Sequence, residues 1–156
     1  MSERPGAPSG GVVDPGATTG GRVLAAVYAV FALAAGARSL VQLTTKLDEA
    51  PLAYLLSFAA AVVYLVATLA LRRSTPRAHR VAVTACSVEL VGVLAVGTLS
   101  LVETDLFPDQ TVWSDFGMGY GFVPLVLPVV GLLWLRRHRP PEPPTERAAE
   151  TPEERF

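Results

Sequence analysis

Glu89 is the residue of this chain that is best placed to do chemistry, because it is an acid inside a long apolar segment. It is the only charged residue between Arg80 and Glu103. A carboxylate at the bilayer centre costs roughly 2.5–3.5 kcal/mol on insertion scales, so it should face protein or water, pair with a base, or stay protonated. Tyr64 lies at a similar depth in the preceding apolar segment and is the expected partner. We interpret Glu89 as a neutral carboxyl that joins two helices, or alternatively as a proton acceptor or ligand contact.

Arg38 is the second candidate, near the outer end of the first apolar segment, with Gln42 one turn further out. Its long side chain can extend to the outer surface and form a salt bridge there. The acids expected to receive it are Asp48, Glu49, Glu103 and Asp115. A guanidinium also binds carboxylates or phosphates through two parallel hydrogen bonds. Arg38 is therefore interpreted as a structural ion pair, with a ligand contact as the alternative.

Glycines alternate with large side chains from Gly117 to Gly121, next to Asp115. The favoured interpretation is a plain turn at the membrane interface. The alternative is a broken or re-entrant start of the last helix that holds Asp115 over the mouth of the bundle. A phosphate-binding loop is not expected, because no strand precedes the segment and no GK[ST] follows it.

Catalytic, cofactor-binding and metal-binding residues are not expected. The single Cys86 excludes an internal disulfide, a CxxC pair and a cysteine zinc site. His79 and His138 both lie among arginines at helix ends, and the chain has no H-E-x-x-H motif and no credible Ser-His-acid set. No basic block is dense enough to favour nucleic acid. The sequence therefore predicts a protein that is not an enzyme and needs no cofactor.

Four long apolar segments must position these residues. At a rise of about 1.5 Å per residue, about 20 residues cross a hydrocarbon layer of roughly 30 Å. Each segment is long enough, so the expected fold is an all-α bundle of four transmembrane helices at about 22–45, 51–71, 78–102 and 118–135. Pro51 suits the first turn of the second helix, whereas Pro124 and Pro128 are expected to kink the fourth.

The loops between these segments alternate in charge. Four arginines and no acid occupy 72–80, whereas four acids and no base occupy the outer loop 103–117, and Arg136, Arg137 and Arg139 follow the last segment. Because arginine and lysine stay on the cytoplasmic side, both termini should be cytoplasmic. The flanking stretches 1–21 and 137–156 are polar and rich in glycine or proline, and are expected to be disordered tails of a single domain at 22–136.

Small residues form a continuous stripe on the first helix, at Ala25, Ala29, Ala32, Gly36 and Ser39. Such stripes let helix backbones approach closely, which drives helix association in lipid. The same spacing places Ser57, Ala61, Tyr64 and Thr68 on one face of the second helix, and Ala85, Glu89, Gly92 and Val96 on one face of the third. We expect these three faces to meet inside the bundle.

Residues 37–43, 49–56, 113–120 and 122–125 resemble uncharacterised small four-span integral membrane proteins of high-GC Gram-positive (actinobacterial) bacteria. The resemblance covers about 22–136 and omits both tails. It implies four spans and a plasma-membrane location, and it implies no activity.

The expected function is that of a multi-pass plasma-membrane protein that acts by helix packing, as an accessory, scaffold or regulatory subunit. Its partners would be the lipid bilayer and another membrane protein or further copies of itself. The alternative is a small proton-coupled transporter or channel in which Glu89 carries protons and Arg38 meets an anion. Four helices enclose little room for a wide pore, which favours the first hypothesis.

Overall fold

The chain is mainly helical in the part that a computed structural model describes, residues 18–140. The predicted tails at 1–21 and 137–156 lie almost entirely outside these residues. In chain order the elements are α1 (Thr19–Thr45), α2 (Pro51–Leu71), α3 (Pro76–Val102), the short 3-10 helices η2 (Thr104–Leu106) and η3 (Ser114–Tyr120), and α4 (Val123–Arg137). No strand occurs within 18–140, which confirms the all-α class.

Two threonine caps set where α1 and α3 begin. The Thr18 hydroxyl accepts a hydrogen bond from the Gly21 amide (3.3 Å), and the Thr75 hydroxyl accepts one from the Ala78 amide (3.1 Å). A capping hydroxyl satisfies an amide that the first turn leaves free. The helices therefore begin two to three residues before the predicted starts at 22 and 78, whereas α2 occupies the predicted residues 51–71.

Three helices, α1, α2 and α3, are long and apolar enough to cross a membrane. With 15 residues, α4 is only about 22 Å long at a rise of about 1.5 Å per residue. It counts as a fourth span only together with η3, from which it is bent by 98°. Large apolar side chains also point outward, as Leu33 (74% exposed) and Val91 (66% exposed) show. A surface of this kind suits lipid, so the chain is a multi-pass membrane protein with three spans, or four if the bent pair is one.

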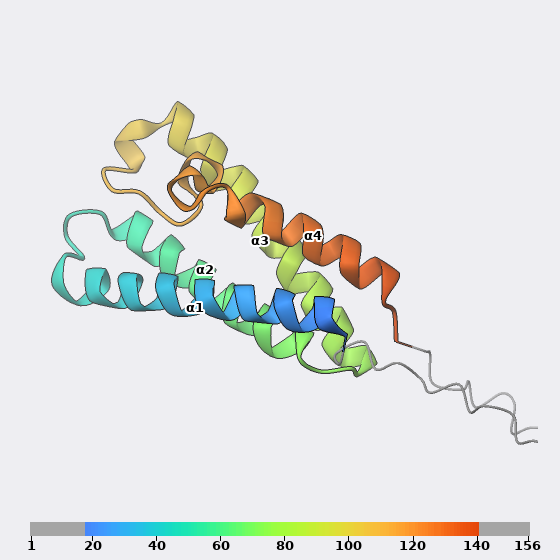
Figure 1. The fold of residues 1–156 in the computed structure, drawn as a ribbon. Helices are drawn as coiled ribbons and strands as arrows, with labels where there is room; N and C mark the ends of the chain where they lie inside the picture. Colours follow the sequence, from blue (N-terminus) through green and yellow to red (C-terminus); the bar gives the residue numbers. More distant parts are fainter. Residues whose placement is uncertain (1–17, 141–156) are drawn as a thin grey trace, which may run out of the picture.

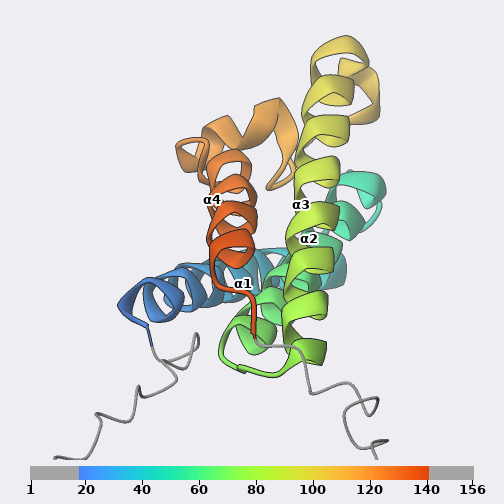
Figure 2. The same cartoon turned by 90° about the vertical axis from the view of Figure 1, so that its right-hand side faces the viewer.

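The helices form a bundle in which α1 packs mainly on α2, α2 on α3, and α3 on α4 and η3. The start of α1, the end of α4 and the α2–α3 connection lie at one end (Figure 1). The α1–α2 connection and residues 103–122 lie at the other end, and Figure 2 shows the latter segment returning across the bundle to the start of α4. We call these the arginine end and the loop end. Both described termini thus lie at the arginine end.

The interior contains the faces that the small-residue spacing predicted. All four predicted residues of α2, Ser57, Ala61, Tyr64 and Thr68, are buried. On α1 the ends of the predicted stripe, Ala25 and Ser39, are buried and its middle is half-buried. Alanine is the most frequent residue of the buried core, and Tyr28, Tyr54 and Tyr64 are the largest side chains that are fully buried.

The predicted start of the fourth helix at Met118 is wrong, as is the predicted kink at Pro124. Residues Asp115, Phe116 and Gly117 have positive φ, and Gly121 and Phe122 are again left-handed (φ 63° and 60°). The α4 helix therefore begins only at Val123. Pro124 lies in its first turn, where the backbone N–H that proline lacks would have had no partner within the helix. This break agrees with the broken or re-entrant interpretation of 113–122 rather than with the favoured plain turn.

Candidate functional site

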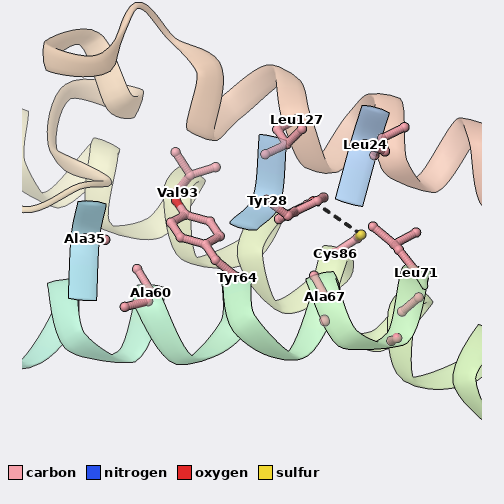
Figure 3. Close-up of a cluster of buried hydrophobic side chains, with 14 of the residues drawn as sticks. Leu24, Tyr28, Ala35, Ala60, Tyr64, Ala67, Leu71, Cys86, Val93 and Leu127 are labelled. Atoms are coloured by element: carbon pink, nitrogen blue, oxygen red, sulfur yellow. Dashed lines mark hydrogen bonds between the residues drawn. The ribbon is translucent and has the colours of Figure 1, made fainter. Parts of the chain in front are cut away.

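A polar cluster lies in the middle of the bundle, between α1 and α3. The Tyr28 hydroxyl donates a hydrogen bond of 2.7 Å to Oε2 of Glu89 and lies 3.4 Å from Sγ of Cys86. Figure 3 shows Tyr28 of α1 pointing to Cys86 of α3 among apolar side chains. Glu89 is completely buried (0% exposed), and its second oxygen, Oε1, has no hydrogen-bond partner among the described residues.

The α4 helix packs closely over this cluster at Gly131, which has no side chain. A Cβ added at Gly131 would lie 3.0 Å from Sγ of Cys86 and 3.5 Å from the Tyr28 oxygen. The missing side chain lets α4 close over the cluster. None of the ion pairs formed within 18–140 includes Glu89. The structure therefore fits the interpretation of Glu89 as a carboxyl that joins two helices by a hydrogen bond.

Tyr64 is not the partner of Glu89, contrary to the prediction from depth. Its hydroxyl accepts a hydrogen bond of 3.0 Å from Nε1 of Trp113. Tyr28 was missed as the partner: it is not one of the small residues of the predicted stripe, although it lies beside them, one turn from Ala25 and from Ala32. Depth alone could not choose between two tyrosines, because the choice depends on which helix neighbours α3 at that level.

Trp113 reaches into the bundle from the loop end. Its ring lies so close to α3 that a Cβ added at Gly92 would be 2.7 Å from Cζ3. A tight turn fixes the ring: the Thr111 hydroxyl accepts hydrogen bonds from the amides of Trp113 (3.0 Å) and Ser114 (2.9 Å). Because Gly92 is one turn nearer the loop end than Glu89, the indole separates the buried carboxyl from the loops.

A second polar cluster lies at the loop end and contains Arg38 and Gln42. Nη1 of Arg38 donates to the Tyr120 hydroxyl (2.8 Å), and Nη2 lies 3.8 Å from Oδ1 of Asp109. Nε2 of Gln42 donates to the other oxygen of Asp109 (3.2 Å). Arg38 thus extends to an acid of the outer loop as predicted, but that acid is Asp109, which was not among the four expected.

Asp115 does not meet Arg38. Its amide donates to the Ser100 hydroxyl of α3 (2.9 Å), and its carboxylate accepts a hydrogen bond from Nε2 of Gln110 (3.4 Å). The backbone of Asp115 has a positive φ of 50°. The next residue, Phe116, packs closely on α3, because a Cβ added at Gly97 would lie 2.6 Å from its ring. Asp115 therefore helps to hold the loop on α3.

Aromatic rings separate the two polar clusters. Phe31 lies between Tyr64 and Tyr120, with ring centroids 5.9 Å and 6.2 Å away, and Tyr64 lies 6.1 Å from Tyr28. The rings form a continuous row from the buried carboxyl to the residue that binds Arg38. Aromatic pairs at such distances contribute about 0.5–1.5 kcal/mol each beyond the area that they bury.

Chemistry beyond hydrogen bonding has few candidates in the described part of the chain. Among residues 18–140, no group of three His, Cys, Asp or Glu side chains could hold a metal ion. His138 stacks on Trp134 with ring centroids 4.6 Å apart. What the arrangement offers is a buried carboxyl with one free acceptor oxygen, and a half-exposed arginine at the loop end.

Comparison of the chain with protein-family models, with curated proteins and with solved structures returned no match. The resemblance to small actinobacterial membrane proteins therefore stays a prediction.

Proposed function

We propose that this multi-pass protein lies in the plasma membrane with both termini in the cytoplasm and acts as a non-enzymatic accessory, scaffold or regulatory subunit. The burial of Glu89 supports the proposal most directly. The one acid of the membrane interior is 0% exposed, is hydrogen-bonded to Tyr28, and is separated from the loops by Trp113. An acid held in this way stabilises helix packing. The protein then acts through the outward faces of its helices, which contact its partner.

The proposed orientation rests on the distribution of charge over the two ends. The arginine end contains the last residues of α4, Arg136 and Arg137, and Arg139 just after it, together with Arg22, Arg72, Arg73, Arg77 and Arg80. The acids of the described residues other than Glu89 all lie in the two connections at the loop end. The arginine-rich end is the cytoplasmic one under the positive-inside rule.

A second candidate function is proton-coupled transport, and one observation favours it. Oε1 of Glu89 has no hydrogen-bond partner within the described chain, and a buried acceptor without a partner costs about 1–3 kcal/mol. A site that keeps such an acceptor free can bind a proton or a solute. Arg38 would then meet an anion at the loop end.

A flux measurement separates the two functions. The full chain is reconstituted in liposomes containing a pH-sensitive dye, and proton flux is followed after a pH step, with Glu89→Gln and Ser57→Ala as the test and control variants. Ser57 is also buried but belongs to neither polar cluster. Under the accessory proposal all three proteins conduct no more than empty liposomes. Flux that Glu89→Gln abolishes and Ser57→Ala retains would establish transport instead.

The partner is sought by photo-crosslinking in native membranes. A photoreactive residue replaces Leu33 on α1 or Val91 on α3, two of the most exposed apolar positions. The accessory proposal expects a discrete crosslinked band, to another membrane protein or to a second copy, from a position on the contact face. If scanning the exposed positions of all four helices gives no band, the protein has no stable partner and the proposal is wrong.

A further inference from the structure

A groove runs between α2 and α3 on the outer surface of the bundle, towards the arginine end. Its volume is about 650 Å³, within the range of about 300–1,000 Å³ that is usual for ligand sites. Its walls are apolar, and the side chains that matter below are Val62, Val66, Val81, Ala85 and Val88. The valines are exposed, so the groove faces the lipid rather than the core.

Two arginines close the groove at one end. Arg77 and Arg80 lie in the first turns of α3 and line the same groove as the valines. Neither belongs to an ion pair formed within 18–140. The acids in the described chain lie at the loop end, apart from the buried Glu89. Two positive charges therefore remain uncompensated by described residues where the apolar groove ends.

The groove, with its arginines included, is about as long as the hydrocarbon half of one leaflet is thick. From Arg77 to Val88 the α3 axis rises about 16 Å, at about 1.5 Å per residue. Half of a hydrocarbon core of about 30 Å is about 15 Å. On α3 the valines cover about 10 Å of this rise, which is most of the depth of one set of acyl chains, and the arginines at the end of the groove lie on the side of the headgroup phosphates.

We propose that this groove binds an anionic phospholipid from the leaflet at the arginine end, with an acyl chain against the valines and the phosphate between Arg77 and Arg80. A guanidinium presents paired donors that match phosphate oxygens, and basic pockets between transmembrane helices bind anionic headgroups. The apolar walls select a lipid over free phosphate. The site is independent of the accessory function proposed above.

Native mass spectrometry of the full chain tests the site. The protein is released from detergent micelles that contain phosphatidylglycerol and phosphatidylcholine in equal amounts. We expect one phosphatidylglycerol to be retained in preference to phosphatidylcholine. At about 1 kcal/mol for each arginine near the headgroups and 1.4 kcal/mol for each factor of ten, Arg77→Gln with Arg80→Gln should weaken its retention about 30-fold.

Three further measurements make the test specific. Arg136→Gln with Arg137→Gln removes the same charge from the same end of the bundle but outside the groove, and should retain the lipid as the unchanged protein does. Val66→Phe, at an exposed position of the wall, should reduce retention of both lipids, and millimolar inorganic phosphate should not displace phosphatidylglycerol. Equal retention of the two lipids, equal losses in the two arginine pairs, or displacement by phosphate would each overturn the proposal.

Discussion

Gly92→Ala is the substitution that most directly tests how the loop end closes the bundle. The added Cβ would lie 2.7 Å from Cζ3 and 2.8 Å from Cη2 of Trp113. The ring cannot retreat without giving up the hydrogen bond of its indole N–H to Tyr64. One methyl group on α3 should therefore displace the tryptophan that separates Glu89 from the loops.

The expected loss of stability follows from three terms. Overpacking costs about 1–3 kcal/mol, and loss of the Trp113–Tyr64 hydrogen bond costs about 0.5–1.5 kcal/mol. Replacing a helical glycine by alanine returns at most about 1 kcal/mol. The free energy of unfolding of Gly92→Ala should therefore be lower by about 0.5–3.5 kcal/mol.

Fluorescence reports the displacement directly once a single tryptophan remains. In a Trp134→Phe background, Trp113 is the only emitter, and Gly92→Ala should shift its emission to the red and increase its quenching by acrylamide in micelles. Gly36→Ala is the matched control, because its added Cβ would lie an ordinary 3.8 Å from Ala61. If Gly92→Ala matches Gly36→Ala in emission, quenching and stability, the indole does not pack on α3 as described.

Three further predictions concern the polar clusters and the topology. Glu89→Gln keeps an acceptor for the Tyr28 hydroxyl and should change the free energy of unfolding by less than about 1.5 kcal/mol. Glu89→Ala leaves a cavity and should lower the free energy of unfolding by about 2–4 kcal/mol in the same denaturation assay. A double-mutant cycle with Arg38→Gln and Asp109→Asn should give a coupling below about 1 kcal/mol that falls further in salt, because the side chains are 40% and 39% exposed; a larger coupling would make this pair a main support of the loop. In intact cells, a membrane-impermeant thiol reagent should label Asp109→Cys and not Ser74→Cys, and the opposite pattern would reverse the proposed orientation.

Hydropathy and charge predicted the large features of this fold because each is a local property of the chain. A run of apolar residues bounded by Pro51 and Arg72 already determines both ends of α2. Spacing by three and four determines which residues share a helix face, and that rule alone placed Tyr64 and Glu89 in the interior. These predictions needed no knowledge of which helices are neighbours.

The candidate site was harder to predict, because its contacts join segments far apart in the sequence. Tyr28 bonds Glu89 across 61 positions, and Arg38 bonds Tyr120 across 82. The segment around Trp113 contains acids and glycines, which lower its hydropathy. Hydropathy therefore predicts an interfacial loop there. Only the alternation of glycines at 117, 119 and 121 indicated that its backbone departs from a regular helix.

The hydrogen bond from Trp113 to Tyr64 anchors the outer loop in the interior of the membrane domain. A tyrosine hydroxyl and an indole N–H each cost about 1–3 kcal/mol when buried without a partner. Tyr64 is fully buried on α2 and Trp113 is buried against Gly92, and the tyrosine oxygen accepts the hydrogen bond that the indole N–H donates. The exposed Arg38–Asp109 pair contributes at most about 1 kcal/mol. The tryptophan therefore anchors the loop from within, and a change at the loop end that moves this ring would reach the surroundings of Glu89.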